Sequence, residues 1–487
     1  MHPGLWEVRT LYSPVALSPI DVTAGRLTLI NRTDFTNLQG AVDLAWRVTV
    51  EGVVLSSGQQ AAPNCVPHSS VEVVLNGVSG LPAGALLTVY VILATADTFR
   101  PKGHLVSVWQ SDLTTTSSSS SANGRTLQLA AKGKAAAATA AHSLLASLVT
   151  SCCGAPEYDD DEEEEDGNNG NKAKRLVPPL TITTRGDVIS FVGGGSEGLP
   201  TFELLYSQAT GYFASATISG TNEVKLMDGP VPNIWRPTTD NDEGGGTSSF
   251  ATQWMLAGYD RSQLTNVSTT LTESADLTSA TLGVTGTMPV TQPVGTHFDY
   301  VGRFVVWGDG KIDVQTSWSF SGQASAMTPL PRVGLIFRVP NTVEQMTWYG
   351  RGPHENYPDR LTSAPLGIYS STVTGDLHTG YIKPQENGGR GGIRWASLEG
   401  PQSTGLRATA TAGASDLHMS LSRYSMSNLL TARHTADLVP SDALYWHIDA
   451  AQAGLGGDSS WEPRTHPEFR LTATSYSLSF VLSLLSS

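Results

Sequence analysis

Short runs in which apolar and polar residues alternate recur from Leu27 near the start of the chain to Leu482 near its end. Residues 44–50 and 476–482 are two examples, and turns rich in Gly, Pro and Asn separate such runs. Alternation with a period of two places successive side chains on opposite faces of a strand. Periodicity typical of long helices is rare, and the 487 residues include 49 Gly and 27 Pro. The pattern therefore predicts an all-β protein.

The first 113 residues form the first domain that the sequence predicts. About seven short strands separated by turns are expected there, which favours a small antiparallel sandwich without chemistry of its own. Its clearest strands are expected at 27–30, 44–50, 71–75, 87–91 and 104–109.

Residues 114–178 differ in composition. A Ser/Thr run is followed by an Ala-rich stretch and then by eight consecutive acids at 159–166. Like charges at this density repel one another and cannot bury a core, so we expect a disordered insertion. An acidic interaction tail and a metal-binding tract are the other interpretations. Without the nine acids of this stretch, the net charge of −14 falls to about −5, and no basic stripe points to nucleic acid.

Strand signals return at Leu180, and residues 179–487 form the third predicted region. Their length and pattern predict a large antiparallel sandwich of two extended sheets. Residues 253–256 are expected to be one of few short helices or irregular segments. Three cysteines do not make a disulfide framework, and neither a signal peptide nor a membrane span is recognised at the sequence level. We therefore expect a cytoplasmic protein.

Four stretches of this region are dense in Gly, Asp, Asn, Trp and Arg. They lie at 235–246, 348–360, 384–392 and 456–461, the last with its lead-in at 421–425. One expectation is that they are loops in which arginines hold carboxylates by two-point pairs. The arginines are Arg236, Arg351, Arg360 and Arg390, and the carboxylates are those of Asp240, Asp242, Glu355, Asp359 and Glu386.

The same composition suits carbohydrate, because carboxylates and guanidinium groups bind sugar hydroxyls while Trp covers an apolar sugar face. Trp461 lies on a Gly/Ser loop, and its partner is the chain's own core, another domain or a sugar ring. Glu355 and Glu386 are the best candidates for a retaining glycosidase pair, which needs carboxyl groups about 5–5.5 Å apart. Metal, serine-nucleophile, phosphate-loop and dinucleotide motifs are not recognised.

The sequence at these stretches resembles the C-terminal part of the β-galactosidases of glycoside hydrolase family 2. The resemblance rests on five motifs in order along the chain. They are Arg-Pro-Thr-Thr-Asp-Asn-Asp-Glu-Gly at 236–244, Gly-Arg-Gly-Pro-His-Glu-Asn-Tyr-Pro-Asp-Arg at 350–360, Glu-Asn-Gly-Gly-Arg at 386–390, Ser-Arg-Tyr-Ser at 422–425 and Gly-Leu-Gly-Gly-Asp-Ser-Ser-Trp at 454–461. The insertion at 114–178 departs from the family pattern.

The resemblance implies an immunoglobulin-like sandwich for 1–113 and a galactose-mutarotase-like supersandwich for 179–487. It also implies that the catalytic glutamates and a magnesium site lie on a (β/α)8 barrel that is absent from this chain. No catalytic residue, metal ligand or cofactor is therefore expected here. Trp461 matches the family tryptophan that stacks on the sugar, and Gly244, Gly245 and Gly246 match the start of a mobile active-site loop. The implied loop framework consists of Arg236, Asp240, Asn241, Asp242, Glu355, Asn356, Asp359, Arg360, Glu386 and Arg390.

Two functional hypotheses follow. In the first, the chain is the C-terminal part or small subunit of a retaining β-galactosidase that acts on terminal β-D-galactose, with a barrel domain or large subunit as partner and an oligomeric assembly. In the second, it is a stand-alone carbohydrate-binding sandwich without catalysis. A mutarotase is a third idea, which needs a positioned His and Glu, and none of the eleven histidines has a supporting sequence context.

Overall fold

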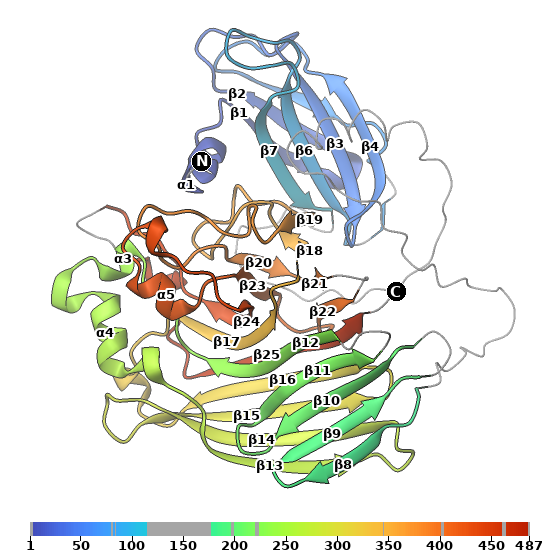
Figure 1. Ribbon diagram of the computed structural model, residues 1–487. Helices are drawn as coiled ribbons and strands as arrows, with labels where there is room; N and C mark the ends of the chain where they lie inside the picture. Colours follow the sequence, from blue (N-terminus) through green and yellow to red (C-terminus); the bar gives the residue numbers. More distant parts are fainter. Residues whose placement is uncertain are drawn as a thin grey trace, which may run out of the picture. The chain divides into compact units, whose positions relative to one another are not determined.

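The computed structural model describes residues 3–78, 81–82, 84–113, 177–195, 199–219, 224–343, 345–400, 404–459 and 464–485 (Figure 1). The insertion expected at 114–178 lies outside these ranges except for its last two residues, and so does Trp461. The chain divides into two compact units. Unit 1 comprises Met1–Gly154, Tyr349–Gly352 and Arg360–Tyr369, and unit 2 comprises Ala155–Trp348, Pro353–Asp359 and Ser370–Ser487.

Unit 1 contains a three-stranded antiparallel sheet of order β1-β2-β5 and a four-stranded antiparallel sheet of order β4-β3-β6-β7. The strands are β1 (Val15–Asp21), β2 (Arg26–Asn31), β3 (Val42–Val50), β4 (Val53–Ala61), β5 (Ser70–Val74), β6 (Leu86–Leu93) and β7 (Leu105–Asp112). Alternate residues of β2, such as Leu27 and Leu29, are fully buried and share one core with Val48 and Leu87 of the other sheet. The seven expected strands are confirmed, whereas helix α1 (Gly4–Leu11) was not predicted.

Unit 2 is built on two nine-stranded sheets, of which the second ends in two strands whose residues 349–351 and 366–369 belong to unit 1. The first has the order β20 (Arg390–Ile393), β23 (Leu417–Ser422), β24 (Ala443–Gln452), β17 (Arg332–Pro340), β12 (Val224–Asn233), β11 (Tyr212–Ser219), β10 (Thr201–Ser207), β9 (Val188–Gly193) and β8 (Thr181–Arg185). The second has the order β13 (Thr265–Glu273), β14 (Ser279–Pro289), β15 (His297–Trp307), β16 (Lys311–Phe320), β25 (Ser475–Leu485), β22 (Gly405–Ala410), β21 (Trp395–Glu399), β18 (Gln345–Arg351) and β19 (Leu366–Thr372).

The two large sheets pack face to face (Figure 1). Aromatic side chains from both sheets meet between them. Phe213 of β11 meets Phe304 of β15 edge to face with ring centroids 6.0 Å apart. Phe337 of β17 meets Phe480 of β25 in the same way at 6.3 Å. Such pairs favour edge-to-face geometry because the positive ring edge meets the negative ring face. The expected all-β fold with two extended antiparallel sheets is confirmed.

Helices in the described part of unit 2 are short. They are α3 (Asp240–Glu243), α4 (Phe250–Ala257), α5 (Met426–Thr431) and 3-10 turns that include η2 (Gly246–Ser248). Helix α4 confirms the short helix that was one of two alternatives at 253–256. It begins at Ser249, whose hydroxyl accepts from the Thr252 amide, and it ends at Gly258 with φ +79. Among the described residues, no helix has the length and hydropathy needed to cross a bilayer.

Candidate functional site

The loops singled out in the sequence meet within unit 2. The segment after β12 carries α3, the segment 383–389 leads into β20, and the segment 453–459 follows β24. The Asp240 amide donates to Gln385 Oε1 at 3.1 Å, and Asn241 Nδ2 donates to the Leu455 carbonyl at 2.9 Å. Residues 145 and 214 positions apart in the chain are therefore joined at one site.

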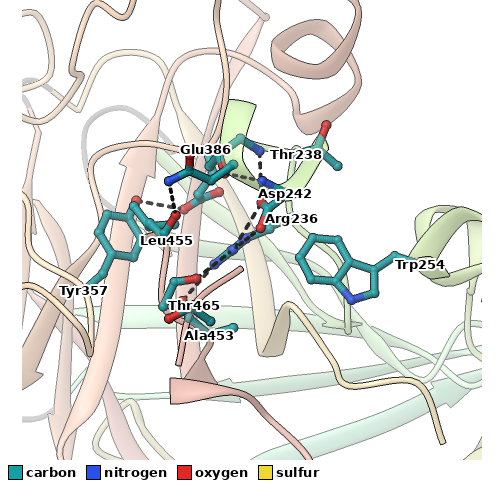
Figure 2. Close-up of polar contacts among 12 residues, drawn as sticks. Arg236, Thr238, Asp242, Trp254, Tyr357, Glu386, Ala453, Leu455 and Thr465 are labelled. Carbon is teal, nitrogen blue, oxygen red and sulfur yellow. Dashed lines mark hydrogen bonds and ion pairs between the residues drawn. The ribbon is translucent and has the colours of Figure 1, made fainter. Parts of the chain in front are cut away.

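Arg236 is the central cation of this site and has no exposed surface. Its Nη2 donates to both carboxylate oxygens of Asp242, at 2.9 and 3.1 Å, and to the Gly454 carbonyl at 3.0 Å. Its Nη1 donates to the Ala453 carbonyl at 2.8 Å, and the guanidinium carbon lies 5.4 Å from the centre of the Trp254 ring (Figure 2). One buried arginine thus ties α3 to the segment that follows β24.

Asp242 is held in place by the start of its own helix. The Thr239 amide donates to Asp242 Oδ2 at 2.9 Å, and the Asp242 amide donates to Thr239 Oγ1 at 3.2 Å. This reciprocal pair is a capping box, and it explains why an acid stands three residues after Thr239. Asp240 and Asn241 of the same helix are exposed. Of the three residues 240–242, only Asp242 is therefore a buried partner of Arg236.

A second anchor of the segment 453–456 is Asp359. Its Oδ2 accepts from the Leu455 amide at 2.8 Å and from the Gly456 amide at 2.6 Å. A Cβ at Gly454 would lie 2.6 Å from Thr465 Oγ1 and 2.7 Å from Asp359 Oδ2, so only glycine fits there. We call 453–456 the clamped segment, because Arg236, Asn241 and Asp359 hold its carbonyl and amide groups from three sides. It leads directly to the glycine-rich stretch before Trp461.

A second buried cluster lies around Arg332 at the start of β17. Arg332 Nη2 donates to Glu386 Oε1 at 2.8 Å, and its Nε lies 3.0 Å from Asp449 Oδ2 of β24. Tyr357 Oη and Gln452 Nε2 each donate to Glu386 Oε1 at 3.2 Å, and Figure 2 shows Tyr357 pointing at Glu386. One guanidinium faces two carboxyl groups here, and burial raises the pKa of Asp449 to about 7.

His447 belongs to the same cluster and was missed at the sequence level. Its Nδ1 lies 3.4 Å from Arg332 Nη1, and the side chain is buried. Burial first, and then the charge of Arg332, hold the pKa of His447 well below its usual range, so the imidazole is neutral. The available signal was the run Tyr445-Trp446-His447-Ile448-Asp449, where His447 and Asp449 interrupt an otherwise apolar and aromatic strand.

The carboxylate of Glu355 is buried and surrounded by hydrogen-bond donors. It accepts from Thr379 Oγ1 at 2.7 Å, from Tyr381 Oη at 2.5 Å and from the Gly388 amide at 2.7 Å. Three such bonds stabilise the carboxylate. Glu355 and Glu386 therefore both lie inside the protein, at 1 and 3% exposure, with their oxygens bonded to neighbouring side chains and backbone.

Arg390 stabilises the loop before β20 through backbone carbonyls. It donates to Gly388 at 2.8 Å and to Asp376 at 2.8 Å, and its guanidinium carbon lies 4.7 Å from the Trp348 ring centre. Burial lowers the pKa of Arg390 to about 10. Asn356 Oδ1 accepts from the Gly391 amide at 2.9 Å, which fixes the neighbouring turn.

The remaining residues expected at the site are placed as follows. Gly244, Gly245 and Gly246 connect α3 to η2, with φ +96 at Gly245 and +60 at Gly246. Their mobility stays a prediction, as does the sugar contact of Trp461, which lies outside the described residues. Arg360 is half-buried and falls in unit 1.

The expected arginine–carboxylate pairs form in part. Arg236 pairs with Asp242, but the arginine that pairs with Glu386 is Arg332, which the sequence did not single out. Among the described residues, no group of three or more His, Cys, Asp or Glu side chains is arranged to hold a metal ion.

Comparison with known proteins places these loops in a family. A model described as the β-galactosidase small chain matches residues 198–482, more than half of the chain. The chain belongs to the β-galactosidase small-chain family. A second model, described as β-galactosidase domain 4, matches residues 27–114, which lie within unit 1.

Relatives of this family member are longer than the chain itself. A β-galactosidase of Vibrio cholerae is 35% identical over 264 residues, which cover 52% of this chain and 24% of the relative. A β-galactosidase of Priestia megaterium is 26% identical over 487 residues, which cover 99% of this chain and 40% of the relative. The chain thus spans well under half the length of these relatives.

Solved structures show only a distant likeness. A GalM/aldose epimerase homologue from C. elegans has a TM-score of 0.29 and 10% identity, covering 64% of this chain and all of the other. Heparan sulfate lyase HepC from Pedobacter heparinus has a TM-score of 0.25 and 7% identity, covering 65% of this chain and 37% of the other. The fold described above therefore rests on the sheets themselves rather than on these neighbours.

Proposed function

We propose that this chain is the C-terminal part or small subunit of a retaining β-galactosidase that hydrolyses terminal β-D-galactose residues. In this proposal it completes the active site of a (β/α)8 barrel carried elsewhere. The observation that carries the proposal is the match of the β-galactosidase small-chain model over 198–482. The length of the relatives supports it, because the P. megaterium protein holds more than half of its residues outside the match.

The burial of the acidic residues also supports a role without catalytic groups of its own. A retaining glycosidase needs one carboxylate free to attack the sugar and a second free to transfer a proton. Glu355 and Glu386 are buried, and their oxygens accept from Tyr381 and Tyr357 among others. Neither has an open face toward a substrate.

The clamped segment gives the chain a means to contribute to a shared site. Arg236 and Asp359 fix its backbone, so the stretch that follows starts from a defined position. In the proposal this stretch presents Trp461 to the sugar held by the barrel. The nucleophile, the acid/base and magnesium then belong to the barrel, and an oligomeric assembly and a cytoplasmic location are part of the same proposal.

The test is an assay of the purified chain with a chromogenic β-galactoside, alone and after mixing with the part of the P. megaterium relative that lies outside the match. We expect no turnover by the chain alone and turnover by the mixture. Turnover by the isolated chain that is lost in Glu355→Gln or Glu386→Gln would contradict the proposal. Galactose binding by the isolated chain that Trp461→Ala abolishes would instead support a stand-alone binding module.

A further inference from the structure

Helix α1 of unit 1 carries four exposed apolar residues along one side. Leu5, Val8, Leu11 and Tyr12 are 51, 49, 57 and 82% exposed, and no residue of the helix is buried. The spacing of three and four residues places these side chains on one stripe of the helix surface. A short helix on a globular protein normally turns such a stripe toward the core.

Two polar residues that flank the stripe, Glu7 and Arg9, fix this orientation. The two carboxylate oxygens of Glu7 accept from the backbone amides of Thr362 and Ser363, at 3.0 and 2.9 Å. Arg9 donates to the Leu105 carbonyl of β7. All of these partners belong to unit 1. Because Glu7 and Arg9 are hydrogen-bonded to other parts of unit 1, rotating the helix to bury the apolar stripe would break these bonds.

An eight-residue helix is marginal in water unless it packs on something. Exposing four apolar side chains on it gives up the burial that usually stabilises such a helix. The arrangement is favourable when a partner surface covers the stripe. We propose that Leu5, Val8, Leu11 and Tyr12 form a docking face for the barrel-bearing part of the β-galactosidase, an inference that rests on the function proposed above.

Two observations favour that occupant over a second copy of this chain. The P. megaterium relative matches 99% of this chain with only 40% of its own length, so it carries more than this chain's own length of further protein with which to cover such a face. In addition, two copies of this chain that paired through their stripes would bury too little surface area for a specific interface. At roughly 100 Å² for Leu or Val, roughly 200 Å² for Tyr and these exposures, two copies together bury roughly 650 Å², below the roughly 1,200 Å² of a specific interface.

The test measures binding of the full chain to the unmatched part of the P. megaterium relative by isothermal titration calorimetry. The variant is Leu5→Gln/Val8→Gln, and the matched control is Leu277→Gln/Val294→Gln, two exposed apolar residues of unit 2 at 49 and 88% exposure. We expect the first variant to raise the dissociation constant at least tenfold and the control to change it less than twofold. Circular dichroism checks that both variants keep the strand content of the wild-type chain.

The outcomes separate this inference from the proposed function. Absence of binding by the wild-type chain contradicts the proposed function and the docking face together. Binding of normal strength by Leu5→Gln/Val8→Gln contradicts the docking face alone. A dimer of the wild-type chain in sedimentation velocity that this variant dissociates assigns the face to a second copy and also overturns the inference.

Discussion

Three arginines of unit 2 have almost no exposed surface, and each meets a different set of partners. Arg236 pairs with one carboxylate and two carbonyls, Arg332 faces two carboxyl groups, and Arg390 bonds to carbonyls over a Trp ring. Burying a charge is expensive unless partners meet it with good geometry. Each arginine therefore makes the position of the loops around it specific, because displacing a loop leaves a buried charge unpaired.

The substitution Arg236→Lys tests whether a buried arginine fixes the loops around it. Lysine cannot reproduce a fork that reaches Asp242, Ala453 and Gly454 together. We expect the free energy of unfolding of unit 2 to fall by about 3–5 kcal/mol, the usual loss when a buried pair is broken. Urea denaturation followed by tryptophan fluorescence measures the change.

The matched control is Arg338→Lys in the same unit. Arg338 is 41% exposed and lies 3.5 Å from Asp228 and 3.1 Å from Asp442. Exposed pairs contribute about 0–1 kcal/mol, so this variant is expected to change stability by less than about 1 kcal/mol. Equal effects of the two substitutions would show that the buried pair does not stabilise the loops.

Asp449 predicts a dependence of stability on pH. Burial, opposed by Arg332, raises the pKa of Asp449 from 3.8 to about 7 in the folded state. The folded protein thus binds a proton that the unfolded chain releases above about pH 4. The stabilisation from this group is fully present below pH 4 and is lost as the pH rises toward and through 7.

The measurement compares wild type with Asp449→Asn, which resembles the protonated carboxyl and does not titrate. At about 1.4 kcal/mol for each pH unit, the difference in unfolding free energy between the two proteins should shift by up to about 4 kcal/mol between pH 4 and 8. The shift should favour the variant as the pH rises. Groups remote from residue 449 titrate alike in both proteins and cancel. A difference that stays constant with pH would refute the assignment.

At the scale of elements, the clamped segment 453–456 makes a prediction about local stability. Asp359→Asn replaces the carboxylate that accepts from the Leu455 and Gly456 amides. Bonds to a charged acceptor contribute about 1.5–3 kcal/mol, so opening of the segment should become at least tenfold more frequent. Hydrogen–deuterium exchange with peptide resolution detects this as faster exchange at 453–459.

Exchange in strand β17 serves as the internal control of this hydrogen–deuterium exchange experiment. Strand β17, which pairs with both β12 and β24, should exchange at the wild-type rate if the effect is local. Faster exchange across β17 would indicate general destabilisation instead. Unchanged exchange at 453–459 would mean that Asp359 does not anchor the segment.

The sequence predicted elements well where burial alternates along a strand. In β16, every second residue from Ile312 to Phe320 is buried, and the period of two identifies such a strand without any knowledge of its partners. Helix α1 escaped prediction because its stripe of Leu5, Val8, Leu11 and Tyr12 lies among residues that were interpreted as the start of a strand region. Its orientation depends on Thr362 and Ser363, more than 350 residues away, and no local pattern reports such contacts.

The sequence also identified some residues of the candidate site and missed others. Loop motifs singled out Arg236, Asp242 and Glu386, because clusters of Gly, Asp and Arg are visible in one stretch of sequence. Arg332 and Asp449 were missed because each lies in a largely apolar strand outside the loop motifs, and only the pairing of β17 with β24 brings them together. Partners across a sheet are set by tertiary structure, which a single sequence does not display.

At the scale of the whole molecule, unit 1 is assembled from separated parts of the chain. Besides the N-terminal residues it includes Arg360–Tyr369. Gln110 of β7 bonds to this segment twice: its Nε2 donates to the Leu366 carbonyl and its Oε1 accepts from the Leu366 amide, both at 2.8 Å. A protein cut after residue 113 would lack these partners, although it would keep all seven strands of the two small sheets.

A double-mutant cycle isolates what residues 360–369 contribute to the stability of unit 1. Its two changes are the substitution Gln110→Ala and truncation of the chain after residue 113. Gln110→Ala in the full chain removes two bonds to backbone, and we expect it to lower the protection of the β6 amides by about 1–2 kcal/mol. In a fragment of residues 1–113 the bonds to Leu366 are already absent, and only the bond from Gln110 to Thr88 remains. There the same substitution should cost less than about 1 kcal/mol. Exchange rates of the amides of β6, measured by NMR in both proteins, give the two values. If the substitution costs the same in the fragment as in the full chain, the distant segment does not stabilise unit 1, and the first 113 residues form a self-sufficient domain.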